Sequence, residues 1–132
     1  MQARIYSDGG SRGNPGEAGI GVFIEDNEGN VIKEISQYIG EQTNNVAEYK
    51  ALCRGLEVAL DLGLKSVTCY LDSELVVKQI KGEYKVKNEA MILMFNMVKP
   101  LIKQFEKFEI VHIKRELNKK ADALANRAMD NK

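Results

Sequence analysis

Residues 7–16 contain four glycines and lie between two apolar runs, at residues 3–7 and 18–24. Apolar runs bounded by glycine, asparagine and proline are typical of strands joined by a turn. We therefore expect strands at residues 2–8 and 18–26 with a tight glycine-rich loop between them. Asp8 stands where the first strand should stop, and a carboxylate beside such a loop is a candidate binding residue, because the bare backbone lets a ligand approach closely.

The remainder of the chain first continues the strand pattern and then alternates helix and strand. A turn at residues 27–30 and an apolar run at 31–39 complete an antiparallel meander of three strands. Later strands follow helices and can therefore lie parallel to the first strand. The expected later elements are a helix at 44–62 capped by Thr43 and ended by Gly63, a strand at 66–71, a short helix at 73–80, a polar connection at 81–87, a helix from Asn88 to 108 bent near Pro100, a strand at 109–114 and a helix from Asn118 to 129.

This order predicts an α/β fold with a mixed five-stranded sheet and helices on both faces. A chain of 132 residues with 44% hydrophobic and 29% charged residues suits a single domain, residues 1–132. No apolar run approaches the ~20 residues of a membrane span, and no basic-then-apolar leader opens the sequence. We expect a cytoplasmic monomer with no membrane association. Cys53 and Cys69 should be reduced and buried, although a disulfide between them stays open.

The formal net charge of zero hides an asymmetry along the chain. Residues 1–48 hold three Lys and Arg against eight Asp and Glu, whereas residues 49–132 hold sixteen against eleven. The basic residues gather at 78–87 and 114–120. Charge clusters usually form a solvated surface, but a basic rim around an acidic centre also suits a polyanionic partner.

Two aspartates close two of the predicted strands. Asp8 follows Tyr6 by two residues and Asp72 follows Tyr70 by two, so each Asp shares a face with its Tyr. If the two strands are parallel neighbours, both carboxylates lie at the edge of the sheet where α/β proteins bind ligands.

Two further carboxylates come from predicted helices. Glu48 continues the apolar stripe of Leu52 and Leu56 and should face the sheet, where an unpaired carboxylate requires a cation or hydrogen-bond donors. Alternatively, Glu48 turns outward and favours the helix dipole. Asp122 flanks the stripe of the last helix, and alone it would be an ordinary surface residue.

Several carboxylates with few neutral ligands suit hard cations such as Mg²⁺ or Mn²⁺. A zinc site is disfavoured, because His112 is the only histidine of the sequence and the cysteines lack ligand spacing. A carboxylate pair for glycoside hydrolysis is the rival use, but it would normally need an aromatic sugar cleft, and the chain has no tryptophan.

Four segments, at residues 8–16, 43–48, 70–73 and 118–125, together resemble type 1 ribonuclease H (ribonuclease HI). The resemblance implies the ribonuclease H-like fold and an endonuclease that hydrolyses the RNA strand of RNA–DNA hybrids. It also implies 5′-phosphate and 3′-hydroxyl ends, formed by a two-metal mechanism with Mg²⁺ or Mn²⁺. The metal-binding and catalytic carboxylates would be Asp8, Glu48, Asp72 and Asp122, with Asp8 bridging the two ions.

The same resemblance implies substrate contacts from small and amide residues whose backbone can reach the RNA 2′-hydroxyls. These residues are Gly9, Gly10, Asn14, Thr43, Asn44 and Asn45. Thr43 is equally well explained as a helix cap, and Asn14 as a turn residue. Both roles are compatible with substrate binding.

The sequence departs from the family pattern in three respects. Only residues 80–87 stand where well-studied bacterial members carry a basic, tryptophan-containing helix. Substrate binding should therefore depend more on lysines such as Lys85 and Lys87, and its affinity should depend strongly on the salt concentration. The histidine of the catalytic loop is absent; we interpret His112 as structural and expect Arg115 to contact the phosphate or leaving group instead. No separate hybrid-binding domain is present in the sequence.

Two alternatives to the nuclease hypothesis stay open at this point. A nucleic-acid-binding module without catalysis would have no use for four carboxylates that repel phosphates. A phosphotransferase would normally carry a Walker-type Gly-Lys-Ser/Thr segment, which the sequence lacks. Cleavage of duplex RNA is a further open question.

Overall fold

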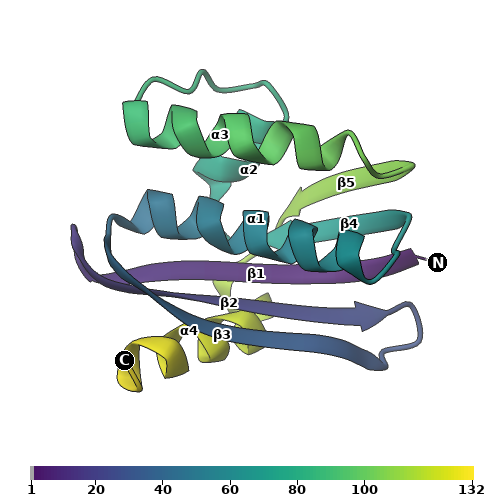
Figure 1. Cartoon of the computed structure of the whole chain (residues 1–132), viewed down its shortest axis with the longest axis horizontal. Coiled ribbons are helices and arrows are strands. Elements are labelled where there is room, and N and C mark those ends of the chain that lie inside the picture. The colour runs from purple at the N-terminus through teal and green to yellow at the C-terminus, as the bar shows by residue number, and fades with distance from the viewer. Residues whose placement is uncertain (1) are drawn as a thin grey trace.

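The computed structural model describes residues 2–132 and contains one five-stranded sheet of order β3-β2-β1-β4-β5 (Figure 1). Strands β1 (Gln2–Gly13), β2 (Gly16–Asp26) and β3 (Val31–Gln42) pair in antiparallel fashion. Strands β4 (Ser66–Leu71) and β5 (Lys107–His112) extend the sheet in parallel from β1. The predicted mixed sheet is therefore confirmed.

Helices cover both faces of this sheet (Figure 1). Helix α1 (Asn44–Asp61) packs on one face of β1 and β2, with α3 (Glu89–Ile102) packed against α1, and α2 (Glu74–Ile80) follows β4. Helix α4 (Lys119–Asp130) lies on the opposite face of β1, β2 and β3, after the short 3₁₀ helix η1 (Arg115–Leu117). Within residues 2–132, none of the helices combines the length and the apolar character needed to cross a membrane.

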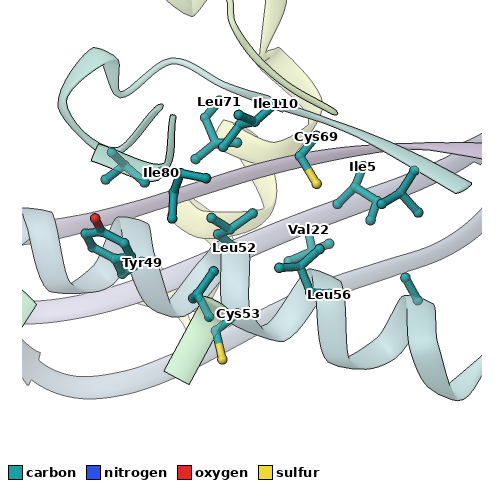
Figure 2. Packing of buried hydrophobic residues seen from close by; sticks show 14 of the residues in the cluster. Ile5, Val22, Tyr49, Leu52, Cys53, Leu56, Cys69, Leu71, Ile80 and Ile110 are labelled. Carbon is teal, nitrogen blue, oxygen red and sulfur yellow. The ribbon is translucent and has the colours of Figure 1, made fainter. Parts of the chain in front are cut away.

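The main hydrophobic core lies between α1 and the sheet (Figure 2). Leu52 and Leu56 of the predicted helical stripe are fully buried there against strand residues such as Ile5 and Val22. The buried Tyr49 hydroxyl donates a 2.6 Å hydrogen bond to Gln79 Oε1, which ties α1 to α2. Cys53 and Cys69 are free and buried, as predicted.

The glycine-rich stretch forms paired strands, and the loop predicted between strands at 2–8 and 18–26 is wrong. β1 continues to Gly13 and β2 begins at Gly16, so only Asn14 and Pro15 form the turn. Gly13 has a positive φ of 112°, a backbone conformation that favours glycine. The other glycines of the stretch lie in the ladder, each opposite a residue of the same hairpin.

Close helix packing explains why this hairpin is rich in glycine. A Cβ added at Gly9 would overlap the backbone of Ala47 in α1, and one added at Gly21 would overlap the backbone of Ala121 in α4. Gly21 is paired with Asp8 across the β1–β2 ladder. The glycines therefore let a helix approach the same strand pair from each face, close to Asp8.

The predicted boundaries of three other elements are also wrong. The predicted helix to residue 108 ends at Ile102, two residues after Pro100, and the buried Phe105 lies in the turn that follows. The N–H groups of Glu106 and Lys107 both donate to the carbonyl oxygen of Lys65, just before β4, so β5 begins two residues earlier than predicted. β3 extends past residue 39 because a register irregularity opposite β2 accommodates Gly40, whose φ is 78°.

The packing of α4 on Gly21 leads to a stability prediction. Gly21→Ala should lower the free energy of unfolding by about 1–3 kcal/mol, because the methyl group has no space beneath the backbone of α4. Urea denaturation monitored by circular dichroism measures the change. Gly10→Ala is the matched control, because its Cβ would meet only the flexible end of Met129 at 3.5 Å. Equal stability of the two variants would contradict this account of the hairpin.

Candidate active site

The parallel pairing of β1 with β4 brings two aspartates to the same edge of the sheet. Tyr6 is directly opposite Tyr70 in the register, and the two rings stack with centroids 4.9 Å apart and planes 17° apart. Asp8 and Asp72 each follow their tyrosine by two residues, so both carboxylates emerge on the same face. Asp72 directly follows the end of β4, as predicted, whereas Asp8 lies within β1, which continues past the predicted strand end to Gly13. The predicted juxtaposition is confirmed.

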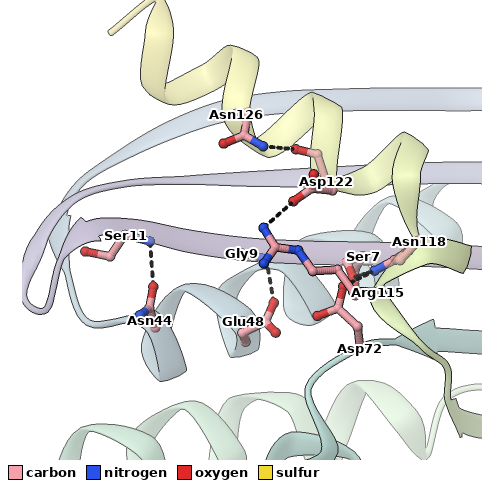
Figure 3. Close-up of polar contacts among 10 residues, drawn as sticks. All are labelled: Ser7, Gly9, Ser11, Asn44, Glu48, Asp72, Arg115, Asn118, Asp122 and Asn126. Carbon is pink, nitrogen blue, oxygen red and sulfur yellow. Dashed lines mark hydrogen bonds and ion pairs between the residues drawn. The ribbon is translucent and has the colours of Figure 1, made fainter.

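Glu48 joins this pair from the first turns of α1. One carboxylate oxygen from each of Asp8, Glu48 and Asp72 lies within 4.8 Å of the others. Glu48 faces the sheet, as predicted, and its Oε1 accepts a 2.6 Å hydrogen bond from the Gly9 N–H (Figure 3). Asp8 and Glu48 are each only 9% exposed. We refer to these three side chains as the acidic cluster.

Asp122 lies beside the acidic cluster on the first turns of α4. It lines the same groove as the other three carboxylates, and its side chain is 32% exposed. Arg115 Nη2 approaches Asp122 Oδ1 at 3.7 Å (Figure 3). All four predicted carboxylates therefore meet in one groove, with Asp122 at its more solvated side.

Burial and mutual repulsion perturb two of these carboxyl groups. Burial is the main cause that raises the pKa of Asp8 to about 8, and the charges of Asp72 and Asp122 add to it. Burial, followed by the charge of Asp8, raises the pKa of Glu48 well above its ordinary value, although the hydrogen bond from Gly9 opposes the rise. Concentrated negative charge of this kind is relieved by a bound cation.

The donor set of the groove fits a hard divalent cation. The acidic cluster offers three carboxylate oxygens within coordinating range, and Asp122 offers a fourth carboxylate nearby. The residues that line the groove include no cysteine or histidine. Oxygen-only ligands of this kind suit Mg²⁺ or Mn²⁺ better than zinc.

The groove has a volume of about 400 Å³ and includes several of the predicted substrate contacts. Gly10, Asn44, Asn45 and Arg115 line it, as does Gly9. A methyl group at Gly10 would meet only a side-chain end. Gly9, by contrast, is required by the packing of α1, so ligand access is not needed to explain it.

Asn14 and Asn44 form a hydrogen-bonded link between the hairpin and α1. The Asn44 N–H donates to Asn14 Oδ1 at 3.1 Å. The Ser11 N–H donates to Asn44 Oδ1 at 2.7 Å, as Figure 3 shows. Asn14 is thereby placed at the end of the hairpin, outside the lining of the groove. The link holds Asn44 at the rim, with its Nδ2 turned away from Ser11.

The other predicted substrate contacts, and the histidine expected to be structural, do not line the groove. Thr43 caps α1, with its Oγ1 accepting from the Val46 N–H at 3.3 Å, and does not line the groove. Lys85 and Lys87 are exposed on the segment between α2 and α3. His112 is the last residue of β5 and is exposed, so burial gives no support to the structural role expected for it.

Asn118 is a site residue that the sequence pattern assigned to a different task. It occupies the predicted N-cap position of α4, but its side chain makes no capping hydrogen bond. Its Nδ2 donates instead to Asp72 Oδ2 at 3.1 Å (Figure 3). The four-residue spacing between Asn118 and Asp122, which puts both on one helix face, is the signal that could have revealed it.

A family model described as reverse transcriptase-like matches residues 6–128. The chain is 42% identical over 131 residues to a bifunctional protein of Mycobacterium tuberculosis, covering 98% of this chain and 36% of that protein. It thus spans about a third of the length of this relative.

Solved structures agree over the whole chain. The crystal structure of RNase H1 from the halophilic archaeon Halobacterium salinarum has a TM-score of 0.97 at 37% identity and covers 100% of both chains. LC11-RNase H1 in complex with an RNA/DNA hybrid has a TM-score of 0.93 at 47% identity, covering 98% of this chain and 97% of that one.

The sheet order and the groove of carboxylates therefore define a ribonuclease H-like domain. Within that class, the chain belongs to the type 1 ribonuclease H family.

The raised pKa of Asp8 predicts how stability depends on pH when no metal is bound. The folded carboxyl titrates at about 8, whereas an unfolded Asp titrates at ~4. The folded state therefore holds a proton that the unfolded state loses, so the contribution of Asp8 to stability is fully present below pH ~4 and is lost as the pH rises through about 8. Asp8→Asn should raise the unfolding free energy in EDTA by up to ~5 kcal/mol at pH 8 and by only ~1 kcal/mol at pH 5.

Thermal or urea denaturation at the two pH values measures this effect. Asp26→Ala is a control with the opposite expected effect, because hydrogen bonds from the backbone and side chain of Asn30 lower the pKa of Asp26. Its loss should destabilise the protein at neutral pH. A stabilisation by Asp8→Asn that does not vary with pH would contradict the electrostatic explanation.

Proposed function

We propose that this chain is a metal-dependent endoribonuclease that hydrolyses the RNA strand of RNA–DNA hybrids and leaves 5′-phosphate and 3′-hydroxyl ends. The observation that carries the proposal is the acidic cluster, with three carboxylate oxygens within 4.8 Å of one another in an open groove. An RNase H1 that is 47% identical has been solved in complex with an RNA/DNA hybrid, which supports the choice of substrate. Residues 1–132 would form a single catalytic domain.

In this proposal, Asp8, Glu48, Asp72 and Asp122 are the catalytic and metal-binding residues. Mg²⁺ or Mn²⁺ ions, two per site with substrate bound, would activate the attacking water and stabilise the departing 3′ oxygen. Asp8 shares the acidic cluster with Glu48 and Asp72 and lines the same groove as Asp122, a position that suits a bridging ligand. The Gly9 N–H holds Glu48 toward the cluster.

The protein groups around the cluster are suited to an RNA strand. The rim carries amide donors from Asn44 and Asn45, which can reach phosphates or 2′-hydroxyls, and the absence of a side chain at Gly10 leaves room for a sugar. The guanidinium of Arg115, 78% exposed beside Asp122, is available to a phosphate oxygen or leaving group. Lys85 and Lys87 would hold the backbone of the other strand at a greater distance.

A cytoplasmic monomer is part of the same proposal. The buried thiols of Cys53 and Cys69 are free, as expected in a reducing compartment, and burial raises the pKa of both. The four carboxylates of the groove all come from one chain.

The proposal predicts that Asp8→Asn lowers cleavage of an RNA–DNA hybrid by about a thousandfold or more, because a central anionic ligand is lost. The assay follows a labelled hybrid with Mg²⁺, with Mn²⁺ and with EDTA, alongside duplex RNA and duplex DNA. Asp61→Asn, at the far end of α1, is the control and should keep full activity. Binding of the hybrid without any cleavage by the unaltered protein would favour a binding module instead.

A second prediction concerns the grip on the substrate. Lys85→Ala combined with Lys87→Ala should raise KM for the hybrid with little change in kcat, and should lower the slope of log KM against log salt by up to ~2. Lys33→Ala in β3 is the control. An unchanged salt slope would show that these lysines do not contact phosphates.

A further inference from the structure

Asn118 is a buried residue at the junction of β1, β4 and α4, and it is 1% exposed. Its position just before α4 is one where asparagine commonly caps a helix. Its backbone does begin the helix, since the Asn118 carbonyl accepts from the Asp122 N–H at 3.0 Å. The side chain, however, makes no hydrogen bond to the helix. Helix capping therefore does not account for the asparagine side chain.

The side-chain amide points into the site instead (Figure 3). Nδ2 donates to the Ser7 carbonyl oxygen at 3.0 Å and to Asp72 Oδ2 at 3.1 Å. Both partners are acceptors only, so the NH₂ end of the amide must face them. One side chain directly before α4 thus holds both the carboxylate that follows β4 and the backbone of β1 directly before Asp8.

The opposite end of the same amide is unsatisfied. Asn118 Oδ1 is buried and has no hydrogen-bond partner within residues 2–132. An unpaired buried carbonyl is unfavourable for folding, and a small apolar residue at this position would remove the penalty. The two hydrogen bonds donated by Nδ2, to Ser7 and Asp72, therefore explain why an asparagine stands here.

We propose that Asn118 is a positioning residue that directs the Asp72 carboxylate toward Asp8 and Glu48 so that the acidic cluster can bind a divalent cation. The inference rests on the proposed metal-dependent function. Asp72 is repelled by its two acidic neighbours, and the amide is the donor that holds it in place. Partners of metal ligands of this kind typically change metal affinity by 10–100-fold when removed.

The test measures Mn²⁺ binding to the folded protein by electron paramagnetic resonance and Mg²⁺ binding by calorimetry, without substrate. Asn118→Ala and Asn118→Ser should both weaken binding about tenfold. Serine is a good N-cap but is too short to reach Asp72, so it separates helix capping from positioning. In hybrid cleavage, kcat of both variants should fall at low Mg²⁺ and recover at high Mg²⁺, with KM for the hybrid unchanged.

Asn88→Ala is the matched control. Asn88 also precedes a helix, and its Oδ1 does accept from the Met91 N–H at 3.2 Å, far from the cluster. The variant should lower the melting temperature while metal affinity stays that of the unaltered protein. This comparison distinguishes a loss of stability from a loss of positioning.

The outcomes separate this inference from the proposed function. Metal binding by Asn118→Ser equal to that of the unaltered protein would overturn the positioning role while leaving the metal site in place. A lack of Mn²⁺ and Mg²⁺ binding in the unaltered, folded protein would overturn the metal site and the inference together. Tenfold weaker binding in both Asn118 variants, with Asn88→Ala unaffected, would support the positioning role.

Discussion

Electrostatic repulsion among carboxylates is the constraint on which the rest of this structure depends. Asp8 and Glu48 are almost completely buried, and Asp72 is close enough for the three to share a ligand. In the free protein such a group lowers stability, because each charge disfavours ionisation of the others. The residues must therefore be held together by backbone that is fixed elsewhere, and each comes from a separate element: β1, α1 and β4.

Close packing of α1 and α4 on opposite faces of the β1–β2 pair holds the backbone of these residues in place. Gly9 lets α1 approach β1 until the Gly9 N–H reaches Glu48, and Gly21 lets α4 lie directly over the residue paired with Asp8. A side chain at either glycine would push a helix away from the sheet. The hydrophobic core beneath α1 supplies the stabilisation that offsets the repulsion. Glycine thus sets the distances between carboxylates that are remote in sequence.

Sequence patterns predicted the carboxylates better than the backbone around them. The end of β4 predicts Asp72 and the helical stripe predicts Glu48, because burial and periodicity are local signals. Asp8 is predicted from an expected strand end, although β1 continues past it to Gly13. The glycine-rich stretch was misinterpreted as a loop because glycine usually marks a turn, and nothing local shows that helices press on the strand from both sides. Asn118 was likewise assigned to capping from its position, whereas its actual partners come from β1 and β4, distant in sequence.

The hairpin also shows how packing can prepare a surface for a polar ligand. The Ser11 N–H donates a hydrogen bond to the side-chain oxygen of Asn44, and the side-chain oxygen of Asn14 accepts one from the Asn44 backbone N–H. The bond from Ser11 orients the side-chain amide and the bond to Asn14 fixes the backbone that carries it, so the end of the amide left for a ligand is a donor. Phosphate and ribose oxygens are acceptors, and a donor fixed in advance loses less conformational entropy when it binds them. The same strands that gather the carboxylates thus leave a fixed donor at the rim of the groove, an arrangement that suits the oxygens of the proposed RNA strand.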